Sequence, residues 1–308
     1  MPFLRQGSIH LGRIAGIDLY LHWSWFVVAV IEIGGREGRY SSLGWSALEY
    51  LALFAIVLLH EFGHALACRQ VGGTVDRIML WPLGGVAYVD PPQRPGATLW
   101  SLAAGPLVNV ALMPVLGAAW WAARAAGLKQ SAPDAYTLVF WVLWIDVILL
   151  VFNLLPVYPL DGGQILRSLL WFFMGRARSL YVATILGFVG AAGLVGIALW
   201  MHSTWSLLIA AYILMSCWGG FKSAQAMLRM DKLPRRNDFA CPDCGTHPPV
   251  GNLWKCAGCG QNFDTFAFRA ACPQCGSEFP NTMCGECQKM HSIGEWAAAA
   301  NAGQGIRS

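Results

Sequence analysis

Two histidines and a glutamate lie within five residues of one another in an apolar segment of the chain. In the stretch VLLHEFGHALA, His60 and His64 are four residues apart, which places both imidazoles on one face of a helix. Imidazoles at this spacing can bind one divalent ion. Glu61 follows the first of them, where its carboxylate can act as a general base toward water. Because ionisable groups in apolar helices are costly, we interpret the cluster as functional rather than as two packing histidines.

A third ligand must come from elsewhere, because a hydrolytic zinc site usually has three protein ligands and one open position. The best candidate is Asp161 in the segment NLLPVYPLDGGQILR. Pro156 and Pro159 interrupt a helix there, and the glycines after Asp161 permit a tight turn. The alternative interpretation is that Asp161 is the N-cap of a helix that begins near Gly163.

Eight of the ten cysteines form four C-x-x-C pairs after residue 240. Such pairs are typical of structural zinc sites with four thiolates, so we predict two structural zinc ions in addition to one catalytic ion. The segment resembles a double zinc ribbon in which successive pairs share an ion, and an interleaved pairing is the alternative. The first predicted site is Cys241, Cys244, Cys256 and Cys259, and the second is Cys272, Cys275, Cys284 and Cys287.

The apolar composition predicts a mainly α-helical, polytopic membrane protein. Hydrophobic residues make up 56% of the chain and charged residues 12%, and a spanning helix needs roughly 20 apolar residues. Alternation in the segment before the first span indicates a small strand pair, and TVDRIMLWPLGGVAYV predicts a small membrane-associated β-hairpin. We expect about six transmembrane helices, at residues 19–33, 44–67, 98–121, 135–155, 180–201 and 204–226.

The distribution of Lys and Arg predicts the orientation in the membrane. Six spans put both termini on one side, and that side has thirteen basic residues against four on the other. The positive-inside rule therefore predicts cytosolic termini. We expect the N-terminus to be retained, because its apolar segment lacks a signal-peptide cleavage site. The compact architecture favours a bacterial inner membrane.

A change in composition predicts separate parts. We expect a transmembrane domain over 1–228, a basic linker over 229–239, a cytosolic double zinc ribbon over 240–290 and a disordered tail over 291–308. From Asp238 onward there are four Lys/Arg and six Asp/Glu. This acidic balance disfavours nucleic acid as a partner and favours protein binding or regulation.

Together these motifs resemble the site-2 protease family of intramembrane zinc metalloproteases. The matching pieces are HEFGH at 60–64, WPLGGVA at 81–87, AGPLVN at 104–109 and N-x-x-P-x-x-P-L-D-G-G at 153–163, and the resemblance covers roughly residues 8–225. It implies a zinc ion held by His60, His64 and Asp161, with Glu61 activating water. It also implies an endopeptidase that cleaves transmembrane substrates in regulated intramembrane proteolysis.

The resemblance assigns further expected roles around this centre. It places Asn109 and Asn153 where their amides contact the substrate or a developing oxyanion. It also suggests that the hairpin pairs with an unwound substrate, although a structural role for the hairpin is equally compatible with the sequence. Gly105 is compatible with close helix packing as well as with a place at the centre.

Two other classes of function use the same residues. A membrane adaptor or zinc sensor would need the cysteine pairs, but Glu61 is not needed for metal binding and its presence argues against this class. A metal transporter would need polar groups through the depth of several spans, whereas here they gather at one side. Asp146 and Glu49 lie in spans nearer the other side, and we expect them to be structural or to line a cavity.

Overall fold

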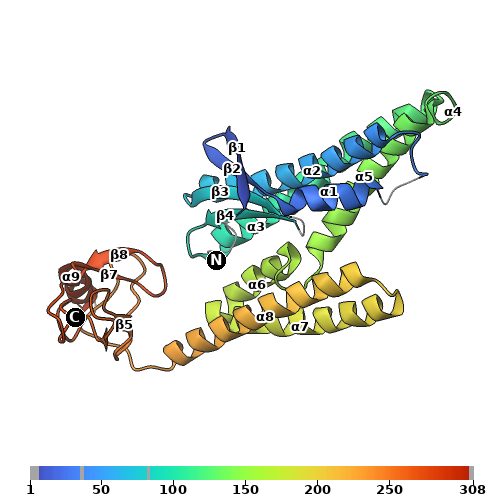
Figure 1. Ribbon diagram of the computed structural model, residues 1–308. Coiled ribbons are helices and arrows are strands. Elements are labelled where there is room, and N and C mark those ends of the chain that lie inside the picture. The colour runs from blue at the N-terminus through green and yellow to red at the C-terminus, as the bar shows by residue number, and fades with distance from the viewer. Residues whose placement is uncertain (1–6, 35–37, 82–83, 305–308) are drawn as a thin grey trace. The chain divides into compact units, whose positions relative to one another are not determined.

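The computed structural model describes residues 7–34, 38–81 and 84–304, and the chain divides into two compact units, Met1–Lys222 and Ser223–Ser308 (Figure 1). Within the described residues, five helices are long and apolar enough to cross a membrane. The chain is therefore a multi-pass membrane protein, as predicted. These helices are α2 (Leu43–Gln70), α3 (Pro95–Ala125), α5 (Pro133–Leu154), α7 (Arg176–Trp200) and α8 (Thr204–Asp231).

The predicted first span, residues 19–33, is wrong. Its beginning belongs to strand β2 (Ile17–His22), which pairs with β1 (Ser8–Ile14) and confirms the predicted strand pair. The helix that follows, α1 (Ser24–Gly34), has 11 residues, or about 17 Å of helix, which is too short for the hydrocarbon core. Trp25 packs edge-on against Tyr50 and Phe54, so α1 lies along α2.

The predicted hairpin is part of a larger sheet. Strands β3 (Thr74–Trp81) and β4 (Gly84–Asp90) are antiparallel as expected, while Pro82 and Leu83 of the predicted WPLGGVA motif lie outside the described residues. β3 also pairs in parallel with β2, which gives the order β1-β2-β3-β4 and leaves β4 at one edge. Buried side chains of β2 and β3, among them Ile17 and Ile78, pack with Val57 and Ala65 of α2.

The connection between α5 and α6 (Asp161–Met174) consists of bends and a turn. Short helix α4 (Leu128–Ser131) precedes α5, and residues 155–160 separate α5 from α6. Gly162 and Gly163 let the start of α6 pack closely against the backbone that precedes it. A β-carbon on Gly162 would lie 2.3 Å from Leu154 O, and one on Gly163 would lie 2.4 Å from Tyr158 N. Leu160 holds the N-cap position, so Asp161 is the first helical residue and not the cap.

Short strands and cysteine turns build the second unit. β5 (Trp254–Lys255) pairs with β6 (Asn262–Phe263), and β7 (Asn281–Met283) pairs with β8 (Met290–Ser292). The predicted linker, 229–239, is not a separate segment. α8 continues through Asp231, and Arg236 forms a 2.7 Å ion pair with Asp264 inside the second unit.

The predicted disordered tail is wrong over residues 293–304, which form α9 (Ile293–Gln304). A capping box begins this helix: Ser292 N donates to Glu295 Oε2 at 2.7 Å, and Glu295 N donates to Ser292 Oγ at 3.3 Å. Trp296 is 2% exposed and packs against Phe266 in the core of the second unit. Capping and one buried aromatic ring thus order a segment whose alanine-rich composition suggested disorder.

Candidate functional site

His60, His64 and Asp161 meet in the first unit. The histidines lie one turn apart on α2, and Asp161 begins α6. Asp161 Oδ2 is 3.0 Å from His60 Nε2 and 3.3 Å from His64 Nε2, and the two Nε2 atoms are 3.1 Å apart. Tetrahedral zinc at about 2.0–2.1 Å from its ligands keeps them about 3.3 Å apart. The three atoms therefore fit one zinc ion.

Both imidazoles direct Nε2 to this point because Nδ1 is engaged elsewhere. His64 Nδ1 donates to the backbone oxygen of Ser101 at 2.8 Å, and His60 Nδ1 lies 2.6 Å from Oδ1 of Asn109. A backbone carbonyl can only accept, so Nδ1 of His64 carries the proton and its Nε2 keeps a lone pair. Such partners on the far nitrogen are typical of metal-binding histidines.

Gly105 of α3 keeps space open beside the imidazoles. A β-carbon at Gly105 would lie 2.3 Å from His64 Nε2 and 2.8 Å from His60 Nε2. Gly63 serves helix packing in the same place, since its β-carbon would lie 2.6 Å from the backbone oxygen of Ala104. The small residues therefore bring α2 and α3 together and leave a cradle at the ligand atoms, as a bound ion requires.

A cavity of about 550 Å³ borders the three groups. Glu61 lines it and is 6% exposed, and its Oε2 accepts a hydrogen bond from Ala87 N at 2.8 Å. Gly85 makes this contact possible, because a β-carbon there would lie 2.3 Å from Glu61 Cγ. Edge strand β4 thus forms a wall of the cavity next to the carboxylate.

The two asparagines of the predicted site are placed differently. Asn153, near the end of α5, lines the cavity. Asn109 is 0% exposed, is not among the described residues that line the cavity, and lies between His60 and Asp146. Its geometry fits support of His60 rather than contact with a substrate. The sequence did not indicate this link, because Asp146 is 37 residues from Asn109.

Glu49 accepts hydrogen bonds from the segment that precedes α2. It is 1% exposed, and its Oε1 accepts a hydrogen bond from Arg39 Nη1 at 3.1 Å. Tyr40 also donates to its carboxylate. This acid therefore joins α2 to the segment before it, in agreement with a structural role.

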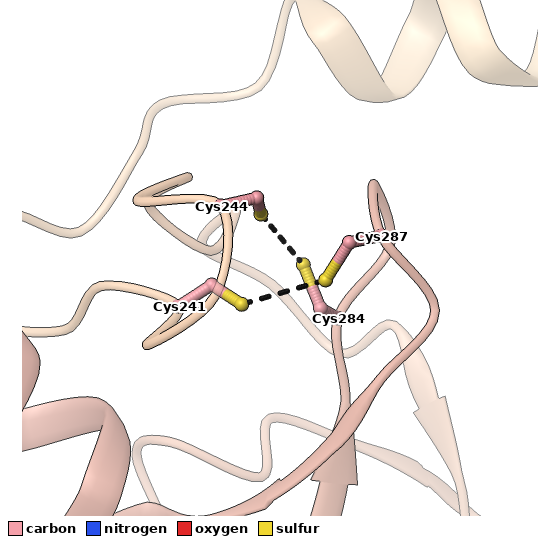
Figure 2. A group of neighbouring side chains, drawn as sticks. All are labelled: Cys241, Cys244, Cys284 and Cys287. Carbon is pink, nitrogen blue, oxygen red and sulfur yellow. Dashed lines mark hydrogen bonds between the residues drawn. The ribbon is translucent and has the colours of Figure 1, made fainter. Parts of the chain in front are cut away.

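The eight cysteines form two groups of four, but not with the predicted pairing. Cys241 and Cys244 meet Cys284 and Cys287, with Sγ–Sγ distances of 3.6 Å for both facing pairs (Figure 2). Tetrahedral zinc with thiolate bonds of about 2.3 Å places sulfurs about 3.8 Å apart, so the geometry fits an ion. The first and fourth C-x-x-C pairs of the sequence form this outer group, and the second and third pairs form an inner group. The predicted sequential pairing is therefore wrong.

The inner group contains the remaining four cysteines. Its facing Sγ atoms are 3.5 Å and 3.7 Å apart. One of its two cysteine turns lies between β5 and β6, and the other lies between β6 and β7. Its members are Cys256, Cys259, Cys272 and Cys275.

Hydrogen bonds and crowding shift the thiols in opposite directions. The hydroxyl and N–H of Ser277 lower the pKa of Cys275 to about 6. The pKa of Cys259 rises to about 12, since a bond from Gln261 N lowers it but burial and three neighbouring thiols raise it more. A cation among the four sulfurs would relieve the repulsion that raises it, because thiolates are the metal-binding form.

Part of the chain matches a known protein family. Residues 49–127 and 122–197 match peptidase family M50, and these segments contain His60, Glu61, His64 and Asp161. Residues 49–197 of the chain therefore belong to this family. The resemblance of its membrane part to site-2 proteases is thereby confirmed.

Several curated proteins are similar to this chain over part of their length. A zinc metalloprotease of Methanocaldococcus jannaschii is 32% identical over 180 residues, which are 58% of this chain and 50% of the relative. Rip3 of Mycobacterium tuberculosis is 33% identical over 177 residues, which are 54% of this chain and 44% of Rip3. The chain therefore spans about half the length of these curated relatives.

A solved structure is similar as well. It is a site-2 protease from Methanocaldococcus jannaschii, 29% identical, with a TM-score of 0.49 and coverage of 70% of this chain and 95% of that one.

Proposed function

We propose that this M50 family member is an intramembrane zinc endopeptidase that cleaves transmembrane substrates in regulated intramembrane proteolysis. The observation that carries the proposal is the convergence of His60, His64 and Asp161 on one cavity beside Glu61. The three side chains would hold the ion. When bound, zinc supplies a Lewis acid that lowers the pKa of water and polarises a carbonyl group.

Glu61 acts as the general base and then as the general acid. Its carboxylate takes a proton from the attacking water and delivers a proton to the leaving amide nitrogen. The hydrogen bond from Ala87 N holds the carboxylate at the cavity wall. Asn153, which lines the same cavity, donates its amide N–H to the substrate oxygen as negative charge develops there.

Edge strand β4 binds the substrate in an extended conformation. A helical substrate must unwind before a carbonyl becomes accessible, and an unwound segment can add to a sheet edge through backbone hydrogen bonds. The cavity wall includes Gly84, Gly85, Val86, Ala87 and Val89, so a segment paired with β4 passes next to Glu61. Apolar lining residues, such as Leu53 and Phe152, suit a transmembrane sequence.

The second unit holds two structural zinc ions, one in the outer and one in the inner cysteine group. The unit serves protein interaction or regulation, since its acidic balance disfavours nucleic acid. β2 pairs with β3, so the N-terminal strands lie on the side of the membrane where α2 ends, and the helix pairs α3/α5 and α7/α8 each return the chain to that side. Most Lys and Arg lie on this side, which supports cytosolic termini. The compact architecture supports a bacterial inner membrane.

The variant Glu61→Gln separates catalysis from metal binding. It should abolish cleavage and leave the zinc content unchanged, because Glu61 is not a ligand. The measurement is comparative proteomics of membrane fragments from cells with wild-type or variant protein, together with zinc analysis of the purified chains. The matched control is Glu49→Gln, a buried acid of the same helix, which should retain activity. Undiminished cleavage by Glu61→Gln would refute the proposal.

A further inference from the structure

We propose that Asp146 is a positioning residue of the metal centre, which acts through Asn109 to fix the tautomer and orientation of His60. The inference rests on the proposed function of the centre and deepens it. It assigns a role to a buried intramembrane carboxylate that the catalytic scheme above does not use.

The three side chains form a continuous chain of hydrogen bonds across three helices. Asn109 of α3 donates from Nδ2 to Asp146 Oδ1 at 2.7 Å, and its Oδ1 accepts from His60 Nδ1 at 2.6 Å. Asn109 and Asp146 are both 0% exposed, and His60 is 5% exposed. Water therefore does not compete for these bonds.

Asp146 decides which way the amide of Asn109 points. An asparagine amide can exchange its oxygen and its NH₂ group by a half turn with little change in shape. Asp146 Oδ1 accepts a hydrogen bond, so the NH₂ group must face it and the amide oxygen must face His60. Oδ1 accepts this hydrogen bond whether or not Asp146 carries a charge.

The orientation of the amide then decides the state of His60. The amide oxygen can only accept, so the ring proton lies on Nδ1 and the lone pair lies on Nε2. That lone pair points to Asp161 Oδ2 and His64 Nε2, at 3.0 Å and 3.1 Å. With the amide reversed, its NH₂ group would face Nδ1 and favour the tautomer with a proton on Nε2. A protonated Nε2 cannot bind the metal.

His64 shows why this support matters for His60. The Nδ1 of His64 is held by a backbone oxygen, that of Ser101, whose direction no side chain can reverse. His60 depends instead on two side chains, those of Asn109 and Asp146.

The second carboxylate oxygen of Asp146 is buried. Asp146 Oδ2 has no hydrogen-bond partner among the described residues, and burying such an atom costs free energy. Helix packing alone does not require this cost.

The test measures zinc affinity of the purified full-length chain by competition with a chromophoric chelator. Asp146→Asn replaces a group that only accepts by an amide that can accept or donate. Asn109 can then present either its oxygen or its NH₂ group to His60. We expect zinc affinity at this centre to fall by roughly 10–100-fold, as is usual for loss of a partner behind a metal ligand. Zinc bound by the cysteine groups is the internal reference and should not change.

Exchanging the two groups should restore the site. In Asn109→Asp combined with Asp146→Asn, the new carboxylate can accept from His60 and from the new amide at once. This double variant should recover roughly tenfold of the lost affinity or more. Asn109→Asp alone should not, because it faces two carboxylates toward each other. Glu49→Gln is the matched control for loss of a buried acid, and it should keep wild-type affinity.

Thermal unfolding of the metal-free chain separates positioning from packing. If Asp146 only joined α3 to α5, Asp146→Asn would lower this stability and leave zinc affinity unchanged. That result, or a double variant no better than Asp146→Asn, would overturn the inference. His60→Ala with His64→Ala tests the centre itself: if zinc content does not fall in that variant, the proposed function fails, and otherwise only the role of Asp146 is at stake.

Discussion

The proposed membrane centre and the two cysteine groups both contain locally spaced pairs of candidate ligands, but the pairs are completed differently. On α2 the pair is His60 and His64, and a single carboxylate, Asp161, completes it from 101 residues after His60. In the second unit every pair is a C-x-x-C turn, and each is completed by another turn of the same kind. Local spacing therefore indicates candidate ligands in both regions, but it indicates which residues complete each group only where the completing residue is chemically distinct.

Support of the ligands differs in the same way. The imidazoles are oriented by groups on other helices, Ser101 and Asn109 of α3. The cysteine turns are held by bonds within themselves, such as Gly245 N to Cys241 O at 2.9 Å. Changes in α3 should therefore affect the membrane centre and leave the cysteine groups intact.

Gly105→Ala tests this difference with the largest expected effect. Its methyl group would lie on the Nε2 atoms of both histidines, so zinc affinity of the membrane centre should fall on the order of 100-fold or more. The measurement is the number of zinc ions that survive a competing chelator. Gly117→Ala is the control on the same helix, since a β-carbon there meets no atom within 4 Å. Equal zinc binding by the two variants would contradict the assigned cradle.

The nesting of the cysteine groups can be tested with two double variants. Cys241→Ser with Cys256→Ser damages both groups of the nested arrangement, so two zinc ions should be lost under chelator competition. Cys256→Ser with Cys272→Ser damages the inner group alone, so one should be lost. The sequential pairing gives the opposite counts, and that outcome in zinc analysis would overturn the nested arrangement.

The smallest expected effect concerns the fourth cysteine turn. Three turns place glycine at a left-handed position, as at Gly245 with φ of 69°, whereas the fourth has Gln288 with φ of 61°. Gln288→Gly should stabilise the outer group by about 0.5–1 kcal/mol, because glycine adopts this conformation without steric cost. The chelator concentration at half-removal of zinc should rise. The reverse change, Gly276→Gln at φ of 70°, should lower it, and a shift of the same sign in both would contradict this reading.

Much of the membrane part could be predicted from the sequence because its signals are local. Long apolar runs indicated α2, α3, α5, α7 and α8, and alternation indicated the first strand pair. The first span was wrong because Ile17–His22 is apolar enough to extend the run of α1, yet its side chains alternate into the sheet. Hydropathy sums over residues and does not register that alternation.

The remaining features depend on contacts between distant residues. The pairing of cysteines could not be predicted, since all four turns have the same backbone bonds and ligand chemistry. The order of α9 rests on a capping box and on burial of Trp296, of which the first was visible in the sequence as Ser292 and Glu295. The link between Asn109 and Asp146 required the packing of α3 on α5, which no local pattern encodes.

Anomalous scattering at the zinc absorption edge, from the purified full-length protein in crystals, addresses the membrane centre most directly. The account predicts a peak about 2.0–2.2 Å from His60 Nε2, His64 Nε2 and a carboxylate oxygen of Asp161, in addition to the peaks of the cysteine groups. Peaks at the cysteines alone, or a membrane peak that Asp161 does not reach, would contradict it.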